Sequence, residues 1–541
     1  MIRRSLTPPA RKGYVLYIVL VVVVVLTLVA YQYSDAMASE AAAATRAHEL
    51  EQAKANAVSG VYVAAAMLTD PSYYTYNLDD DPGLFRAVPV GTANVESDQN
   101  TARWQGDVNK RRGGGLVSLI NLSDKVGSTD GSYPDGLLRY GLEDECRKLN
   151  VNALILLDPT GAVLYEALMK LPNMTPEVAG AIVDWLDSDP NEYPSGGAED
   201  EFYMGLDPAY HCKNGPINSV EELLLVKGVT PDLLFGADRN RNGVQDPDET
   251  ASGQFSRGWS EYLTCYGREI NADAAGIPRL NLNTDDLVLL DEQLMSLEGM
   301  TREVADYILY YRLSGRGEAV QATLPANRVL GTAADLRTLV DNALQSGTAL
   351  PRRRLTSAFT VLNTQIPLPA TAAPPGQPAP PVVVVPCPLN DQKTLTTLAT
   401  VMLDKLTAND DYELVPRVNV NTAPREVIAC LPGLTDEDVE KILSNRPTST
   451  TDPTAAWLVT TAGLDLSKFK NVERFVCGRS GAYRVRSVGY FGTTGGPTAS
   501  VEAVIEVVVE DADGTGAVAR PRIVHFRDTT DLGRVFTDLP R

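Results

Sequence analysis

The first 70 residues divide into a basic stretch, an apolar stretch and a mixed stretch. Residues 1–13 (MIRRSLTPPARKG) carry only basic charges, and residues 14–31 (YVLYIVLVVVVVLTLVAY) are almost entirely apolar. A run of that length just crosses a hydrocarbon core of about 30 Å. Residues 32–68 are rich in Ala, Glu, Gln and Lys, lack proline and are interrupted only by Gly60, which favours helix. The pattern predicts one helix over residues 14–68 that spans a membrane and extends beyond it.

The basic flank predicts which side of the membrane each part occupies. Basic segments stay in the cytoplasm, so the bulk of the chain is expected outside it. The alternative is a secretory signal peptide, because Ala36 and Ala38 form an A-x-A pattern a few residues after the apolar run. The helix-favouring sequence that continues through this pattern favours an uncleaved anchor.

The C-terminal part changes from a helical to an alternating pattern. The segments GAYRVRSVGYF, ASVEAVIEVVVED and PRIVHFRD alternate or run apolar and are separated by GTTGGPT and DADGTG. This pattern predicts three strands joined by turns. The first strands are expected in residues 153–168, which contain ALILLD and GAVLYEAL. Between these regions, residues 365–388 are proline-rich and are expected to form an extended, mobile insertion.

A helical unit recurs through the middle of the chain. Residues 280–312 and 418–447 share an N-x-N-T start, a hydrophobic helix, a glycine-apolar-threonine turn and a second helix. Shorter echoes lie at 171–189 and 226–236, and a further N-x-N stands at 150–152. In the last full copy, Thr422 and Thr435 are predicted N-caps. In the echoes, Thr175 and Thr230 precede prolines, which is the favoured order at a helix start.

These units resemble helix-hairpin-helix modules, but they lack a feature that binds DNA. The DNA-binding modules use two glycines in the hairpin so that backbone N–H groups approach a phosphate, and here threonine replaces the second glycine. Acidic residues follow at 436–438, 303 and 177, where they occupy the positive helix end that a phosphate would need. We therefore expect packing and protein-contact units, and no nucleic-acid binding.

The composition agrees with this expectation. The chain has 541 residues, of which 48 are basic and 69 acidic, giving a net charge of −21. That charge repels polyanions, and the length favours two to four structural units. Six cysteines allow disulfides, but no CxxC pair indicates zinc. No nucleophile, P-loop or zinc-protease motif accompanies the three histidines, so no enzymatic activity is expected.

One segment matches a twelve-residue calcium loop. Residues 238–249 read DRNRNGVQDPDE, with the glycine of the sharp turn at the sixth position and glutamate at the twelfth. The predicted ligands are Asp238, Asn240, Asn242, the carbonyl of Val244, Asp246 and Glu249. A solvated polar loop is the alternative, because Gln245 replaces the usual apolar residue and the flanks are weakly helical. We expect a structural calcium ion.

A second acidic group is a weaker metal candidate. Its members are Asp184, Asp187, Asp189, Glu199 and Asp200. Such carboxylates can share a cation, although solvent-exposed loop charges explain them nearly as well.

Several segments in a fixed order resemble the general secretion pathway protein K family, the large minor pseudopilins of type II secretion. They are DWLDSD at 184–189, GGAEDEFY at 196–203, Tyr210, NGPINSVEELLLVKGVT at 214–230 and NVNTAPREV in the last helical unit. The resemblance implies that a prepilin peptidase cleaves between Gly13 and Tyr14. It places Ile18 at mature position five, where most pilins keep a glutamate and this family characteristically lacks it.

The resemblance also implies an α+β, pilin-like fold in which a long N-terminal helix packs on a small antiparallel sheet and a large helical domain is inserted. The expected parts are a leader (1–13), the assembly helix (14–68), the first part of the pilin-like domain (69–168), the insertion (169–475) and the last strands (476–541). The implied function is a minor pseudopilin, anchored in the inner membrane with its bulk in the periplasm, that assembles with other minor pseudopilins at the pseudopilus tip. The alternatives are a type IV minor pilin and an exported DNA-uptake protein.

Overall fold

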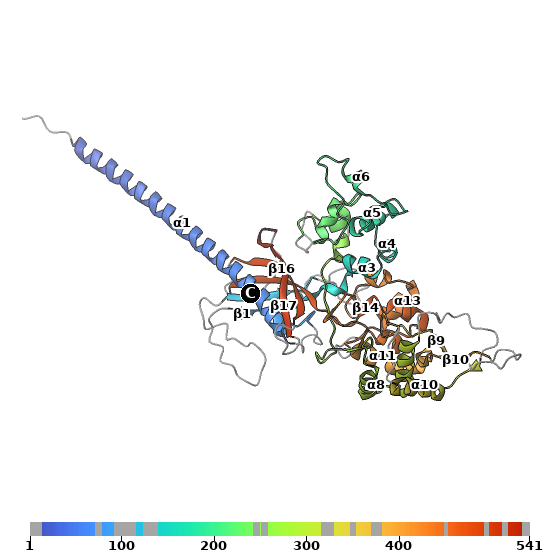
Figure 1. The fold of residues 1–541 in the computed structure, drawn as a ribbon. Helices are drawn as coiled ribbons and strands as arrows, with labels where there is room; N and C mark the ends of the chain where they lie inside the picture. Colours follow the sequence, from blue (N-terminus) through green and yellow to red (C-terminus); the bar gives the residue numbers. More distant parts are fainter. Residues whose placement is uncertain are drawn as a thin grey trace, which may run out of the picture.

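The structure is a computed structural model in which a long helix, a small sheet and a large helical region follow one another in space (Figure 1). It describes residues 13–70, 78–90, 115–122, 139–241, 249, 258–314, 329–346, 353–368, 381–447, 453–491, 497–510 and 518–532. The sheet lies between the free part of the N-terminal helix and the helical region. Mixed helix and sheet with a long N-terminal helix is the fold class that the sequence predicts.

The N-terminal helix α1 runs unbroken from Tyr14 to Met67, a length of about 80 Å. Its apolar half is exposed and makes it long and apolar enough to cross a membrane. Its second half buries Ala53, Ala57 and Val61 against the sheet. Gly60 lies in this contact, where an added Cβ would overlap Ser487 Oγ and Val117 Cγ2. The predicted single helix is confirmed, and Gly60 permits close helix-to-sheet packing without interrupting the helix.

The main sheet is antiparallel and has the strand order β1-β2-β15-β16-β17, with the short strand β3 paired to β15. The three predicted C-terminal strands are confirmed. They form because β-branched residues alternate, so that Val485, Ala503 and Ile505 face α1 in one buried cluster. The strand bounds are β1 Val88–Val90, β2 Gly115–Ile120, β3 Glu143–Asp144, β15 Ala482–Phe491, β16 Ala499–Glu510 and β17 Val518–Asp528.

The strands predicted at residues 153–168 are wrong. This segment forms helices α3 (Val151–Leu157) and α4 (Ala162–Leu168). The Asn150 side chain accepts a hydrogen bond from Ala153 N at 3.0 Å and caps α3. Gly161, with φ of 71°, turns the chain between the helices. A short apolar run does not distinguish a strand from a buried helix, and the cap at Asn150 decides for helix here.

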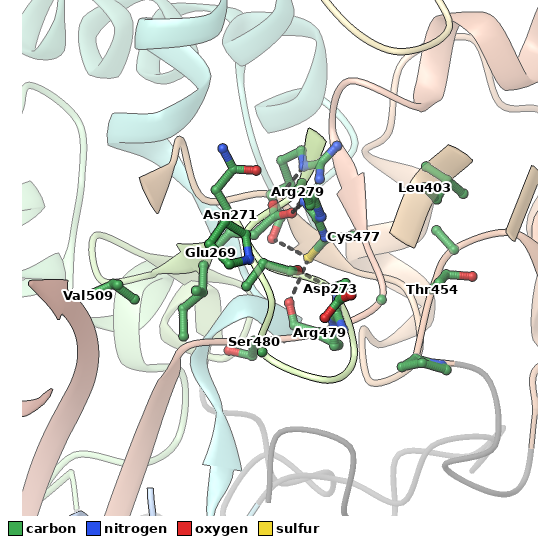
Figure 2. Close-up of a pocket in the computed structure, with 18 of the residues that line it drawn as sticks. Glu269, Asn271, Asp273, Arg279, Leu403, Thr454, Cys477, Arg479, Ser480 and Val509 are labelled. Atoms are coloured by element: carbon green, nitrogen blue, oxygen red, sulfur yellow. Dashed lines mark hydrogen bonds and ion pairs between the residues drawn. The ribbon is translucent and has the colours of Figure 1, made fainter. Parts of the chain in front are cut away.

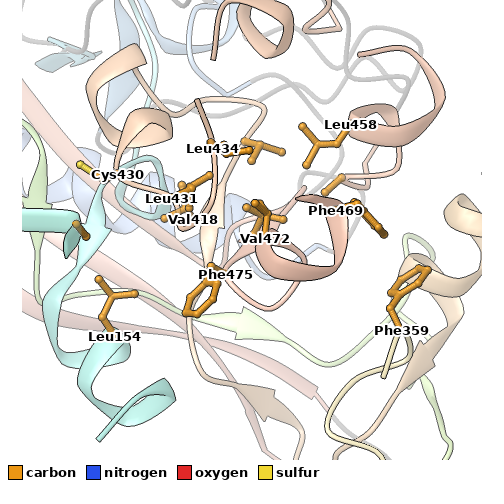
Figure 3. Packing of buried hydrophobic residues seen from close by; sticks show 14 of the residues in the cluster. Leu154, Phe359, Val418, Cys430, Leu431, Leu434, Leu458, Phe469, Val472 and Phe475 are labelled. Atoms are coloured by element: carbon orange, nitrogen blue, oxygen red, sulfur yellow. The ribbon is translucent and has the colours of Figure 1, made fainter. Parts of the chain in front are cut away.

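The helical region extends from η3 (Glu145–Arg147) to β14 (Val476–Cys477). One apolar cluster runs through it and joins segments far apart in the chain. Figure 3 shows Leu154 of α3 beside Phe475. The rings of Phe359 and Phe469 pack edge to face with their centroids 5.1 Å apart. Its further helices are α5 Pro176–Leu186, α6 Asp200–Tyr203, α7 Pro231–Phe235, α8 Leu287–Ser296, α9 Arg302–Leu313, α10 Ala333–Gln345, α11 Gln392–Lys405, α12 Arg425–Ala429, α13 Asp436–Ser444, α14 Trp457–Thr460 and α15 Leu466–Val472.

The ends of the proline-rich segment are ordered in a three-stranded sheet. Strand β10 (Val383–Pro386) pairs with β9 (Gln365–Pro367) and with β8 (Val329–Leu330). Ile366 and Val384 are buried there, so these ends are packed elements. Residues 369–380 of the predicted mobile insertion lie outside the described residues. Shorter pairings elsewhere join β4 (Leu149–Asn150) to β5 (Leu263–Thr264), β6 (Glu269–Ile270) to β12 (Glu413–Leu414), β7 (Leu280–Asn281) to β11 (Leu406–Thr407), and β13 (Val418–Asn419) to β14.

Substitution of Gly60 tests the helix-to-sheet contact. Gly60→Leu is expected to lower the free energy of unfolding by about 1–3 kcal/mol, because the side chain must displace Ser487 and Val117. Chemical unfolding of the detergent-solubilised protein measures this change. Ala66→Leu, at an exposed position of the same helix, is the matched control and is expected to be near neutral. Equal effects of the two substitutions would contradict the close contact at Gly60.

Candidate functional site

Asp184, the first member of the acidic group, fastens a loop onto helix α5. It lies near the end of α5 and is fully buried. Its Oδ1 accepts a hydrogen bond from Tyr193 N at 2.8 Å and its Oδ2 from Ala198 N at 2.6 Å. A Cβ on Gly197 would overlap this carboxylate, so the glycine allows the loop to approach. Burial and the nearby charge of Glu199 raise the pKa of Asp184 to about 6, against the effect of the two backbone donors.

Asp187 and Glu199 are buried carboxylates with unmet hydrogen-bonding capacity. Asp187 Oδ1 and both Glu199 oxygens are buried and accept no hydrogen bond from the part of the chain that the structure describes. Burial and the charges of Asp189 and Asp184 raise the pKa of Asp187 to about 7. Burial likewise raises the pKa of Glu199, against the opposing effect of the nearby Asn214 and Cys212 side chains. Such buried oxygens are costly without a partner, and a hard cation is a partner that suits carboxylates.

The other two members of the acidic group have different partners. Asp189 is exposed, and its Oδ1 accepts hydrogen bonds from the backbone and side chain of Asn191 at 2.9 and 2.7 Å. Asp200 contacts His211 Nδ1 at 3.0 Å and accepts a hydrogen bond from Cys212 N at 2.7 Å. These contacts lower the pKa of Asp200. The structure therefore separates the buried trio Asp184, Asp187 and Glu199 from two loop-closing aspartates.

The trio does not form a complete set of metal ligands by itself. Across the described ranges of the chain, no group of three or more His, Cys, Asp or Glu side chains has a metal-binding arrangement. The orphaned oxygens of Asp187 and Glu199 are the observation that fits a cation.

The ends of the predicted calcium loop meet. Glu249 is buried, and its Oε1 accepts hydrogen bonds from the backbone N–H of Arg239 at 2.8 Å and of Asn240 at 3.5 Å. Asp238, the predicted first ligand, is also buried. The twelfth position thus folds back onto the first turn of the loop, as a closed loop requires. The remaining predicted ligands Asn242, Val244 and Asp246 lie outside the described residues.

The recurring helical units share one local geometry. A residue with positive φ precedes the apolar-threonine pair in each copy: Gly433 at 75°, Gly299 at 84°, Gly228 at 81° and Asn173 at 58°. The threonines Thr435, Thr301, Thr230 and Thr175 then cap α13, α9, α7 and α5. Asn173 adopts the left-handed conformation that glycine provides elsewhere.

The N-terminus of α13 is occupied by side chains of this chain. Asp438 Oδ2 accepts hydrogen bonds from Thr435 N at 2.9 Å and Lys468 Nζ at 2.7 Å. Burial alone would raise the pKa of Asp438, but the hydrogen bonds from Lys468 and Thr435 outweigh burial and lower it to about 2. A carboxylate already interacts with the free N–H groups at this helix end.

The N-x-N-T segments hold remote parts of the chain together. Thr422 was predicted to cap a helix, but α12 begins at Arg425 and its N-cap is Pro424. The Thr422 hydroxyl donates instead to Oδ2 of the buried Asp144 at 2.6 Å, beside the sheet. The prediction failed because a start motif does not reveal a partner that lies far along the chain.

The second asparagine of each N-x-N segment contacts a remote segment through both its amide nitrogen and its amide oxygen. Asn152 exchanges hydrogen bonds of 2.9 and 3.0 Å with the Ile217 backbone, and Asn283 exchanges two of 2.9 Å with the Leu355 backbone. Asn421 donates to Gly478 O at 2.9 Å and accepts from Trp457 Nε1 at 2.7 Å.

A buried charge network that the sequence analysis missed joins the sheet to the helical region. Arg484 of β15 contacts Glu145 of η3 and Glu502 of β16. Lys148 Nζ lies 3.1 Å from Glu143 Oε1, and Arg147 Nη1 lies 3.1 Å from Glu261 Oε1. The alternation in GAYRVRSVGYF was the available signal, since it places Arg484 and Arg486 on the strand face opposite Tyr483 and Val485.

Arginines hold the network carboxylates ionised despite burial. Burial would raise the pKa of Glu502, but Arg486 and Arg484 lower it to about 2. Glu145 is fully buried, and the charges of Arg484 and Lys148 likewise lower its pKa. Each buried charge therefore depends on its partners being in place.

Removal of one partner tests this dependence. Arg484→Met is expected to lower the free energy of unfolding by about 3–5 kcal/mol, because Glu145 stays buried without its main counter-charge and Glu502 loses one of its two arginine partners. Adding Glu145→Gln is expected to restore part of the loss. Arg425→Met, which removes an exposed pair with Glu440, is the control and should cost at most about 1 kcal/mol. Chemical unfolding measures all three, and a neutral Arg484→Met would contradict the network's role.

Comparison with known proteins identifies relatives of two segments. Residues 147–235 and 418–475 each match a family model described as Type II secretion system (T2SS), protein K. The type II secretion system protein K of Aeromonas hydrophila is 31% identical over 134 residues, which cover 21% of this chain and 40% of the relative. The match therefore spans less than half of that relative. The resemblance predicted from the sequence is confirmed.

A comparison with solved structures also found a match. It is a chain of the GspK-GspI-GspJ complex from the type 2 secretion system of enterotoxigenic Escherichia coli, with a TM-score of 0.35 and 10% sequence identity, covering 89% of this chain and 97% of that chain. The two segments matched by family models include the buried acidic trio and the helix pair α12–α13, respectively.

Proposed function

Because two of its segments match family models of type II secretion system protein K, we propose that this chain is a minor pseudopilin that assembles with other minor pseudopilins at the pseudopilus tip. There it initiates or caps the filament and supports protein export. One observation carries the proposal: a continuous helix whose apolar half is free and whose second half packs on a small antiparallel sheet. This is the pilin-like arrangement that subunits need to pack side by side through their helices.

The start of α1 supports processing by a prepilin peptidase. Gly13 is the N-cap of the helix and Tyr14 its first residue, so a cut between them would release the whole helix intact. Ile18, at position five of the processed chain, is exposed on the apolar stretch and carries no charge. The helix would anchor the protein in the inner membrane by a single pass, with the leader cytoplasmic and the bulk periplasmic.

The placement of the helical region supports a tip position. It lies beyond the sheet, at the opposite end of the molecule from the apolar start of α1 (Figure 1). A subunit added above this one would need the space that the helical region occupies. In this proposal the protein acts through packing and not through catalysis.

The recurring helical units are proposed as packing and contact elements. Their asparagines hold remote segments of the same chain, and at the N-terminus of α13 Asp438 accepts a hydrogen bond from Thr435 N and pairs with Lys468. These contacts favour the pseudopilin over an exported DNA-uptake protein. A type IV minor pilin shares the helix and sheet and is the nearest alternative.

Calcium is proposed as a structural cofactor. In the buried trio, Asp187 Oδ1 and both Glu199 oxygens accept no hydrogen bond from the described residues, and the closed ends of the loop at Asp238 and Glu249 offer a second place. A bound cation would offset the buried negative charge and stiffen the loops around α5 and α7. With two calcium sites formed by neighbouring loops, the stability of the region around α5 and α7 would depend on calcium.

The processing step can be tested by N-terminal sequencing and intact mass. Protein recovered from membranes of cells with a prepilin peptidase is expected to begin at Tyr14, and protein from cells without it at Met1. The Gly13→Leu variant, in which only the residue before the proposed cut is changed, is expected to keep the leader in cells with the peptidase and in cells without it. A start just after Ala38 would show that the segment is an ordinary signal peptide.

Calcium dependence can be tested by unfolding at pH 7.5. At the trio, calcium at a hundredfold excess over its dissociation constant is expected to add about 2.7 kcal/mol to the free energy of unfolding of the natural chain relative to chelator. Asp187→Asn is expected to lose most of this gain, whereas Glu201→Gln, at an exposed position, should keep it. An equal gain in Asp187→Asn would exclude the trio as the site.

The same variant has an expected pH signature in chelator. The folded-state pKa values of Asp184 and Asp187 are raised to about 6 and about 7, above the value of about 3.9 for an unfolded aspartate. Their contribution is therefore fully present below pH 4 and is lost as the pH rises through 6 to 7. Asp187→Asn should flatten this loss, and unchanged pH dependence would contradict the burial of its charge.

A further inference from the structure

A cavity of about 90 Å³ lies where the sheet meets the helical region. Its lining comes from β6 and the following loop, from the turn after β14 and from the adjoining ends of β16 and β17 (Figure 2). That volume is several times the volume that one water molecule needs, and it suits a short organic molecule.

Two arginines that line the cavity have unused donors. The Arg279 side chain is 7% exposed; its Nε donates to Asp404 O at 3.2 Å and its Nη1 to Glu269 Oε1 at 3.4 Å. The Arg479 side chain is 13% exposed, and its Nη2 donates to Ala272 O at 2.8 Å and pairs with Asp404. Within the described residues, Arg279 Nη2 and Arg479 Nη1 have no acceptor. The cavity therefore offers two buried guanidinium groups with donors to spare.

The charges around the cavity leave a positive excess. Glu269 is shared by Arg279 and Arg417, and Asp404 pairs with Arg479. Lys405 and Asp273 form a further pair at 2.6 Å. Among these described groups, four positive charges face three negative ones, a difference of +1. Burial lowers the pKa of Arg279 against the effect of Glu269, and Arg417 and Arg479 lower it further.

Apolar side chains form a second part of the wall, beside the polar side chains of Asn271, Thr454 and Ser480. Leu403, Ala455 and Val476 line it from the helical region, and Val509 and Ala519 from the sheet. Inorganic phosphate would gain nothing from these side chains, whereas a short hydrocarbon would bury its surface against them. A molecule that combines one negative group with a short apolar part matches both halves of the lining.

We propose that this cavity binds a small organic carboxylate. Its oxygens accept hydrogen bonds from Arg279 and Arg479, which supply charge-assisted donors, and its hydrocarbon part packs against Val476, Val509 and Ala519. The ligand would bridge the sheet and the helical region at a point where the protein leaves donors unused. The site is separate from the acidic trio and from α1, and it does not depend on the pseudopilin assignment.

Calorimetric titration of the full chain in detergent tests the proposal, with sodium butyrate as the probe. Butyrate is expected to bind with a dissociation constant in the range of about 1–10 mM, the strength typical of so small a ligand. The uncharged isostere butyramide, and sodium phosphate at matched ionic strength, are expected to bind at least about tenfold more weakly, because each lacks one of the two features that the lining recognises.

Two variants make the test specific. Arg479→Met removes a donor, and Ala519→Leu fills the cavity without changing its charge; each is expected to weaken butyrate binding at least about tenfold. Arg425→Met, an exposed arginine outside the cavity, should bind as the natural chain does. Butyramide or phosphate binding as tightly as butyrate, or unchanged binding in folded Ala519→Leu, would overturn the proposal.

Discussion

The buried charges around Arg484 fix the helical region on the sheet. Arg484 belongs to the sheet, while Glu145 belongs to the first turn after it, and the pair lies in the junction between the two parts. Removing these charges from water is costly, and the cost is offset only when the partners lie in one arrangement. An apolar junction would tolerate small rotations, whereas this network favours a single orientation. The direction of α1, which packs on the same sheet, is thereby related to the direction of the helical region.

Much of the fold follows from periodicity and local chemistry. The uninterrupted helix-favouring composition of residues 14–68 predicted α1, and alternation at residues 481–528 predicted β15 to β17. Threonine before an acidic or proline-containing turn predicted the caps at Thr175, Thr230 and Thr435. In each of these cases the determining contacts lie within a few residues, so a single sequence contains them.

The misses share a physical cause, which is a partner far away along the chain. Thr422 caps no helix because Asp144 accepts its hydroxyl. Residues 153–168 have a local cap for α3 at Asn150, but their burial in a core made by distant segments is not visible in the sequence. Proximity in the sequence placed five acidic residues in one group. Only the structure shows that Asp187 and Glu199 are buried, whereas Asp189 and Asp200 are exposed. The charge network was likewise hidden, since its arginines and glutamates lie in segments that only the tertiary fold brings together.

The connection between β3 and β15 gives the architecture its simplest description. These strands are antiparallel neighbours, with Tyr483 opposite Asp144 and Arg484 opposite Glu143. Residues 145–481 are therefore, in topological terms, the loop of a single hairpin. The entropy of closing such a loop grows only slowly with its length, and the sheet order is the same for a short turn or a whole domain. A chain built this way can gain or lose bulk at its distal end during evolution while the strand pairing and the helix that depends on it stay unaltered.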